Sequence, residues 1–145
     1  MNSENNSESP EMTLSFGMEI GRSLGYGRII ALESELGGGK TVLAKGIAVG
    51  LGIDDIDAVT SPTFTLVNRY KTTEGDICHV DLYRLNSAQE AVNIGFEEII
   101  ASGCTVIVEW AERARELFPE ETVWIHIKVL GPQKRRLTIN CPSMT

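Results

Sequence analysis

The sequence lacks several features that would place a protein in a specialised class. It has no apolar run long enough to cross a bilayer, and its Asn-, Ser- and Glu-rich beginning has neither the basic start nor the apolar centre of a secretory leader. The three cysteines, Cys78, Cys104 and Cys141, show no metal-ligand spacing, and their odd number argues against a disulfide scaffold. We therefore expect a cytoplasmic protein with reduced thiols and no membrane contact.

Basic residues are also scarce. Lys and Arg number 13 against 20 Asp and Glu, which gives a formal net charge of −7. A free-standing nucleic-acid-binding protein needs a basic face to neutralise phosphates, so we expect any contact with RNA to be indirect, through a partner. The one dense basic run, Lys134-Arg135-Arg136, favours a solvated hairpin turn, with phosphate or partner contact as the alternative.

The length of 145 residues suits one domain with a proper core. We predict a disordered polar tail over residues 1–11 and a single domain over residues 12–145. We expect Gly46 and Gly50 to let their helix pack closely on a sheet. Periodicity and turn residues predict, in chain order, a helix over Thr13–Leu24, a strand over Arg28–Leu32, a helix over Lys40–Leu51, a strand in the second half of Val59–Tyr70 that forms a hairpin with Ile77–Asp81, a helix over Ser87–Ile94 capped by Ser87, a helical piece over Gly95–Ile100, a strand over Thr105–Val108, a short helix over Glu112–Leu117 and a terminal hairpin of Val123–Leu130 with Arg136–Asn140.

The most informative stretch is Glu35-Leu36-Gly37-Gly38-Gly39-Lys40-Thr41, which joins the first predicted strand to a helix. Strand, glycine loop, Gly-Lys-Thr and helix form the layout of a phosphate-binding P-loop. Its glycines let several N–H groups converge on one anion, at the positive end of the helix dipole. Lys40 would reach the β- and γ-phosphates, and the Thr41 hydroxyl would bind Mg²⁺.

A P-loop needs an acidic partner at the end of a nearby strand. Asp81 and Glu109 each follow an apolar strand pattern. The strand before Glu109 is the more uniformly apolar, as a buried parallel strand should be, so we assign Glu109 to the metal and Asp81 to positioning or activating water. A solvent-facing carboxylate at a strand end is the alternative for either residue.

Other residues carry weaker signals. Thr63, in Ser61-Pro62-Thr63-Phe64, lies where a switch-like loop could sense the γ-phosphate, although a rigid Pro turn explains the pattern equally well. His79 is more often a core or edge residue than a catalyst, and Trp110 is more often a packing residue than a ligand contact. Arg84 could approach phosphate or form a surface ion pair.

Four segments together resemble the TsaE (YjeE) family of small bacterial P-loop ATPases in tRNA threonylcarbamoyladenosine synthesis. They are Glu35–Thr41, Ser61–Leu66, His79–Leu85 and Val108–Glu112, and the likeness runs from about Thr13 to Asn140. The resemblance implies an α/β fold: a three-layer P-loop NTPase sandwich with a mixed, mostly parallel sheet and antiparallel hairpin additions. It also implies that the protein hydrolyses ATP while docked on TsaB and TsaD, where TsaD modifies adenosine 37 of tRNA, and that hydrolysis resets that complex.

The resemblance also suggests roles for particular positions. Lys40, Asp81 and Glu109 match the residues of the family that serve ATP hydrolysis, and Thr41 with Glu109 match its Mg²⁺ site. Thr13 matches a threonine near the adenine, Thr63 the switch threonine and Trp110 the tryptophan beside the acid. The nucleotide-binding positions are then Thr13, Gly37, Gly38, Gly39, Lys40, Thr41, Val42, Thr63 and Trp110.

The chain departs from the family pattern at two positions: Ser34 stands where the P-loop pattern has glycine, and Ala111 replaces a common proline. Ser34 bears on nucleotide affinity and turnover, and Ala111 on the loop after Glu109. Two other functions compete with the ATPase. A small-molecule kinase would need a lid with arginines, for which Arg84, Arg113 and Arg115 are the candidates, and a non-hydrolysing nucleotide-binding scaffold is suggested by Ser34.

Overall fold

A computed structural model describes residues 2–35, 39–54, 56–60, 62 and 66–142. Its elements, in chain order, are β1 (Asn2–Ser7), α1 (Pro10–Leu24), β2 (Ile29–Ser34), α2 (Lys40–Gly50), the 3₁₀ helix η1 (Ile56–Ala58), β3 (Val67–Lys71), β4 (Asp76–Asp81), α3 (Ala88–Asn93), α4 (Phe96–Ala101), β5 (Thr105–Glu109), the 3₁₀ helix η2 (Ala111–Leu117), β6 (Val123–Val129) and β7 (Arg135–Asn140). No helix in this part of the chain has both the length and the hydropathy that crossing a membrane requires.

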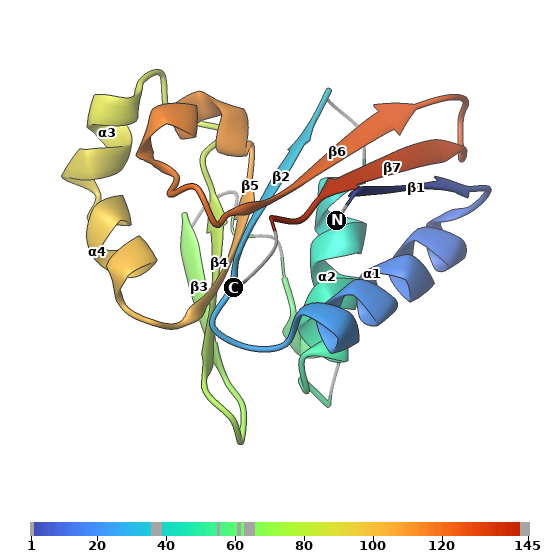
Figure 1. The fold of residues 1–145 in the computed structure, drawn as a ribbon, viewed down its shortest axis with the longest axis horizontal. Coiled ribbons are helices and arrows are strands. Elements are labelled where there is room, and N and C mark those ends of the chain that lie inside the picture. The colour runs from blue at the N-terminus through green and yellow to red at the C-terminus, as the bar shows by residue number, and fades with distance from the viewer. Residues whose placement is uncertain (1, 36–38, 55, 61, 63–65, 143–145) are drawn as a thin grey trace.

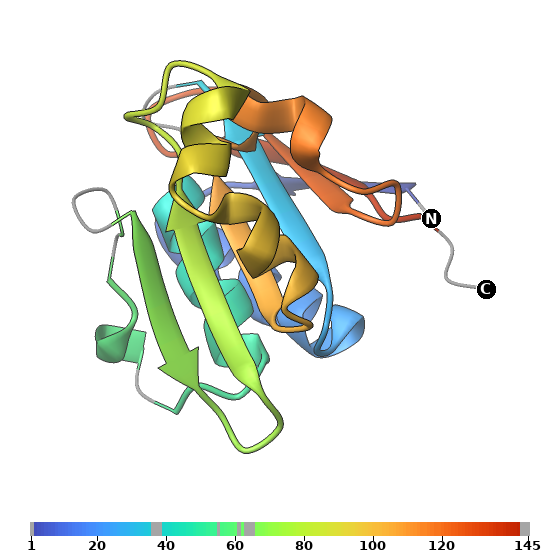
Figure 2. The same cartoon turned by 90° about the vertical axis from the view of Figure 1, so that its left-hand side faces the viewer.

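The strands of these residues form one mixed sheet in the order β1-β7-β6-β2-β5-β4-β3. The central strands β6, β2, β5 and β4 run parallel, whereas β7 and β3 pair antiparallel with β6 and β4. Helices α1 and α2 cover one face of the sheet, and α3, α4 and η2 cover part of the other (Figures 1 and 2). The predicted three-layer α/β fold with hairpin additions is therefore confirmed.

The central strands are apolar throughout because alternate side chains enter different cores. On β2, Ile30 and Leu32 pack with α1 and α2, whereas Ile29 and Ala31 pack in the core beside α3 and α4. A strand buried on both faces has no polar side, so it appears in the sequence as a continuous apolar run. This pattern is why β2 and β5 were predictable from sequence alone.

The N-terminal segment differs from the predicted disordered tail. Asn2–Ser7 forms the edge strand β1, in antiparallel register with β7 from Asn2↔Asn140 to Ser7↔Arg135. Helix α1 then begins at Pro10, because the Ser9 hydroxyl accepts a hydrogen bond from the Met12 amide and proline suits the first helical position. Strand β1 is polar, so the backbone pairing offered by β7 overrides its weak intrinsic preference for a strand.

Helix α2 packs closely on α1, and its glycines serve this contact rather than packing on the sheet. A Cβ atom at Gly46 would lie 2.4 Å from the Leu14 carbonyl oxygen, and one at Gly50 would lie 2.2 Å from that of Met18. Both distances are far below van der Waals contact, so only glycine permits this approach. The expectation of close packing on the sheet was wrong: the backbone that these glycines meet belongs to the neighbouring helix.

Candidate nucleotide site

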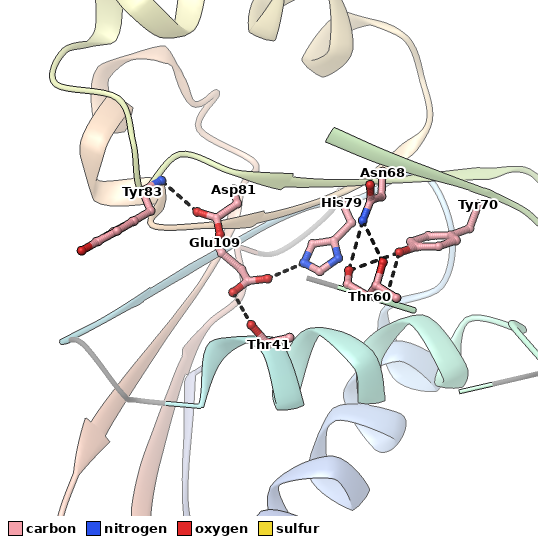
Figure 3. Close-up of polar contacts among 8 residues, drawn as sticks. All are labelled: Thr41, Thr60, Asn68, Tyr70, His79, Asp81, Tyr83 and Glu109. Atoms are coloured by element: carbon pink, nitrogen blue, oxygen red, sulfur yellow. Dashed lines mark hydrogen bonds and ion pairs between the residues drawn. The ribbon is translucent and has the colours of Figure 1, made fainter. Parts of the chain in front are cut away.

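The site lies where three parallel strands end and α2 begins. Strand β2 ends at Ser34, β4 at Asp81 and β5 at Glu109, with Asp81 opposite Glu109 in the register of the sheet. The carboxyl ends of parallel strands meet at one edge of an α/β sheet, which is where such folds bind ligands. Figure 3 shows Glu109 and Asp81 together above the first turn of α2.

The start of α2 is suited to an anion. Gly39 precedes the helix in a left-handed conformation, with φ +87°, and as a glycine it supplies no side-chain cap to the first turn. The first turn also contains no acidic residue, so the unpaired N–H groups and the positive helix end remain available to a negative ligand. Gly37 and Gly38, which were predicted to bind nucleotide, lie outside the described residues.

Lys40 is buried at this edge, with 5% of its surface exposed. Its ammonium group donates to the carbonyl oxygens of Ser34 and Glu35, each at 3.2 Å, and lies 4.0 Å from the centroid of the Trp110 ring. Burial lowers the pKa of Lys40 from its ordinary value. Four carboxylates oppose that shift, in decreasing order those of Glu112, Glu109, Asp81 and Glu35.

Thr41 and Glu109 are in direct contact. The Thr41 hydroxyl donates to Glu109 Oε1 at 2.9 Å, and His79 Nε2 lies 2.5 Å from Glu109 Oε2 (Figure 3). The side chains of Glu109 and His79 are almost fully buried, so both oxygens of the carboxylate are held inside the protein. His79 was predicted to be a core or edge residue rather than a catalyst. Its spacing of two residues from Asp81 on one strand was the available signal, because such residues share a face of the sheet.

Asp81 lies beside Glu109 but makes different contacts. Its Oδ1 accepts a hydrogen bond from the Tyr83 amide at 2.8 Å, and its own amide donates to the Leu66 carbonyl at 2.9 Å. Leu66 has a positive φ of 69°, which marks a sharp turn where the preceding loop enters β3. Thr63, the predicted switch residue, lies outside the described part of this loop.

The same loop is tied to β3 at its other end. The Asn68 amide donates to the Thr60 carbonyl oxygen at 3.1 Å, and the Thr60 amide donates to the Tyr70 hydroxyl at 3.1 Å (Figure 3). Both ends of the segment that contains Thr63 are thus attached to the hairpin whose second strand carries His79 and Asp81.

Thr13, Gly39 and Val42 line one recess of about 110 Å³, together with Pro10, Gln133 and Arg135. The Thr13 hydroxyl is buried and lies 2.7 Å from the Ser7 hydroxyl of β1, so the N-terminal strand positions this residue. The structure therefore brings Thr13 to the start of α2, beyond the last P-loop glycine.

Arg135 is a site residue that sequence reasoning did not separate from its neighbours. It lines the recess beside Gly39, whereas Lys134 pairs with Glu8 at 3.5 Å and Arg136 pairs with Glu4 at 3.5 Å. Successive side chains of a strand point to opposite faces, so the basic run divides between the site and the surface. The alternation was visible in the sequence, but the face that meets the P-loop was not.

Glu112 also belongs to the surroundings of Lys40. Its Oε1 is buried without a hydrogen-bond partner among the described residues. Burial raises the pKa of Glu112 above its ordinary value, against the opposing effects of its own amide, the Lys40 charge and the Ser34 amide. Two of the three candidate kinase arginines lie on the same segment, η2: Arg113 over the rings of Trp110 and Tyr83, and Arg115 paired with Glu33. The third, Arg84, lies between β4 and α3.

A parallel-centred α/β sheet with a glycine-capped helix at its carboxyl edge defines the class: a P-loop NTPase fold. The comparison with known structures agrees, since Bacillus subtilis YdiB superposes with a TM-score of 0.77 and 28% identity over 99% of this chain and 87% of that one.

The particular family follows from sequence comparison. The model of the family described as threonylcarbamoyl adenosine biosynthesis protein TsaE matches residues 7–137, and the chain belongs to this family. A TsaE protein of Treponema pallidum is 38% identical over 92% of this chain and 96% of its own length. One of Aquifex aeolicus is 36% identical over 91% of each. The resemblance stated from the sequence is thereby confirmed, and it places the chain in tRNA threonylcarbamoyladenosine biosynthesis.

Proposed function

We propose that this protein binds ATP with Mg²⁺ and hydrolyses it in the cytoplasm as a subunit of the machinery that modifies adenosine 37 of tRNA, acting on TsaB and TsaD. The contact between Thr41 Oγ1 and Glu109 Oε1 at 2.9 Å is the observation that carries this proposal. It joins the first turn of α2 to the end of β5, where a P-loop ATPase binds its cation. In this proposal tRNA is reached only through the partner proteins.

The residues present fit a magnesium ion. A threonine hydroxyl and a carboxylate are hard oxygen ligands, as Mg²⁺ prefers. No group of three His, Cys, Asp or Glu that could hold a metal exists in the described ranges. That agrees with Mg²⁺, which usually takes one or two protein ligands and completes its shell with phosphate oxygens and water. Thr41 and Glu109 would hold the ion, which when bound neutralises charge on the β- and γ-phosphates.

The other residues would act on the phosphates and on water. The loop amides and Lys40 stabilise negative charge that develops on the β- and γ-phosphate oxygens, in a buried place where water does not screen it. Asp81, one strand from Glu109, orients the attacking water. Thr13 and Val42 contact the nucleoside from the recess beyond Gly39. Trp110 limits the position of the Lys40 ammonium.

The test is a reconstitution with purified TsaB and TsaD. We expect slow ATP hydrolysis by the isolated chain, faster hydrolysis with TsaB and TsaD, and sustained threonylcarbamoylation of tRNA only when all three proteins are present. Lys40→Ala and Glu109→Ala should each reduce ATP turnover by about a hundredfold or more, the scale seen when one stabilising group is lost. Lys45→Ala, further along the same helix, serves as the control.

Two outcomes would contradict the proposal. Brisk turnover by the isolated chain that TsaB and TsaD do not change would exclude partner dependence. ATP binding that Lys40→Ala abolishes, without phosphate release in any mixture, would instead establish a non-hydrolysing scaffold.

A further inference from the structure

His79 is a buried polar residue to which the proposed function gives no role. It lies on β4 with 1% of its surface exposed, and its Nε2 is 2.5 Å from Glu109 Oε2. A buried histidine must hydrogen-bond somewhere, and many do so to a backbone carbonyl for stability alone. Here the partner is the carboxylate proposed to hold the cation, so the contact bears on the site.

The two oxygens of Glu109 have separate partners on opposite sides. Oε1 receives the Thr41 hydroxyl from α2, and Oε2 contacts His79 from the neighbouring strand (Figure 3). As a ligand of Mg²⁺ the Glu109 carboxylate only accepts hydrogen bonds, so the proposed site requires the proton of this bond on His79 Nε2. With one oxygen fixed by His79, rotation about the last side-chain bond of Glu109 is restricted, and Oε1 stays directed at Thr41.

The register of the sheet makes this contact specific. His79 on β4 lies opposite Ile107 on β5, and Asp81 lies opposite Glu109. The His79 side chain therefore contacts Glu109 diagonally, from one strand to the adjacent one. Cys78 and Val80, its neighbours on β4, enter the core on the other face of the sheet. A shift of one residue in either strand would remove the contact, because side chains alternate between faces.

We propose that His79 is a positioning residue for the cation site, which fixes the Glu109 carboxylate in the orientation that Mg²⁺ requires. This inference rests on the proposed function, since it assigns His79 to the same magnesium site. A group that orients a metal ligand typically changes metal affinity by about 10- to 100-fold when it is removed. Its loss leaves the phosphate cradle of α2 intact, so it should act on the cation far more than on the nucleotide.

The experiment measures binding rather than turnover. A fluorescent ATP analogue is titrated into the protein in EDTA, and Mg²⁺ is then titrated at fixed nucleotide. For His79→Leu we expect an affinity in EDTA within about twofold of the unmodified protein, and a Mg²⁺ midpoint raised about 10- to 100-fold. His79→Gln, whose amide nitrogen can occupy the place of Nε2, should recover much of the loss, whereas the shorter His79→Asn should not.

Val80→Ala is the matched control. Val80 is adjacent on the same strand and fully buried, but its side chain lies in the other core. We expect it to lower thermal stability without moving the Mg²⁺ midpoint. A Mg²⁺ midpoint that is unchanged in His79→Leu, or an equal loss of affinity with and without Mg²⁺, would overturn the inference.

A spectroscopic measurement tests the contact without nucleotide. A buried imidazole N–H that donates to a carboxylate should give a downfield proton resonance, which disappears in His79→Gln and moves in Glu109→Gln. Absence of that resonance in the unmodified protein would also overturn the inference. This measurement remains decisive if the His79→Leu variant fails to fold. If the unmodified protein binds no ATP, the proposed function fails. If it binds ATP and the His79 variants keep a normal Mg²⁺ midpoint, only the role of His79 fails.

Discussion

The ammonium nitrogen of Lys40 lies 4.0 Å from the ring centroid of Trp110, and the Trp110 backbone adopts a left-handed conformation, with φ 57°. A non-glycine residue with positive φ is uncommon and costs free energy, so such a conformation persists only where the surrounding structure requires it. At Trp110 it turns the chain sharply between Glu109 and η2. The Glu109 carboxylate of the proposed cation site and the Trp110 ring beside Lys40 therefore depend on the same turn.

Replacing Trp110 should weaken ATP binding. A desolvated cation–π contact contributes about 1–2 kcal/mol. Without the ring, the Lys40 side chain would lose more conformational freedom when phosphate binds, and this loss lowers the affinity. For Trp110→Leu we expect ATP affinity to fall about tenfold, which corresponds to about 1.4 kcal/mol, as measured by calorimetry. Trp124→Leu is the control, because the Trp124 ring packs instead on Phe118 and on Arg115, whose Cζ lies 4.3 Å from the ring centroid. Equal losses in both variants would point to a general loss of packing.

Ser34, the departure from the P-loop pattern, should have little effect on nucleotide binding. Among the described residues only Leu66 and Trp110 have positive φ outside glycine, so Ser34 does not need the conformational freedom of glycine. Its hydroxyl donates to the Glu35 carbonyl at 2.9 Å, and its carbonyl accepts from Lys40. We expect Ser34→Gly to change ATP affinity less than about twofold and to destabilise the strand end by about 0.5–1 kcal/mol. A tenfold gain in affinity would show that serine distorts the loop.

Part of this fold could be predicted because the sequence patterns there reflect the physics directly. Strands β2 and β5 are buried on both faces, and a glycine-containing turn joins β3 to β4, so periodicity and turn residues identified these strands. Strand β1 was missed for the opposite reason. Its residues are polar and its strand state depends on pairing with β7, more than a hundred residues away in the sequence.

The site divides in a similar way. Lys40, Thr41, Asp81 and Glu109 were predictable as neighbours, because each lies at the carboxyl end of a strand or the start of the following helix. Their chemical roles stay predictions. The contacts of His79, Arg135 and Glu112 were not predictable, since they depend on strand register and on the turn at Trp110. Sequence spacing does not fix either feature.

Enlarging Gly46 should destabilise the protein and disturb the recess lined by Thr13 and Val42. A Cβ atom there would lie 2.4 Å from the Leu14 carbonyl oxygen and 3.0 Å from the Gly17 α-carbon, so α1 and α2 must separate. Overpacking costs about 1–3 kcal/mol, and a clash with backbone atoms at 2.4 Å belongs at the upper end, which exceeds the helix preference of alanine, about 1 kcal/mol. We expect Gly46→Ala to lower the free energy of unfolding by about 1–2 kcal/mol in urea titrations.

The same separation should weaken ATP binding, because Thr13 on α1 and Val42 on α2 line one recess. Gly131→Ala is the control, since a Cβ atom there would meet only the flexible Lys134 side chain at 3.8 Å or more. An unchanged free energy of unfolding in Gly46→Ala would mean that α1 and α2 tolerate a wider spacing, and that their close contact at Gly46 is not required for stability.

Glu112 gives a prediction about pH. Burial raises its pKa in the folded protein above the ordinary value of 4.5, and Lys40 offsets this only in part. Between the ordinary and the raised pKa, the folded state binds more protons than the unfolded state. The free energy of unfolding therefore falls as pH rises through this interval, and the penalty is fully present above the raised pKa.

Glu112→Gln removes that ionisation, so its stability relative to the unmodified protein should increase from pH 4 to pH 8. We expect the melting-temperature difference to change in favour of Gln as pH rises, as measured by thermal unfolding at each pH. Glu116→Gln, an exposed substitution on the same segment, should show no such trend. If Glu112→Gln instead lost stability as pH rose, the carboxylate would be a net stabilising partner of Lys40. The Oε1 atom, buried without a hydrogen-bond partner among the described residues, would then need a different explanation.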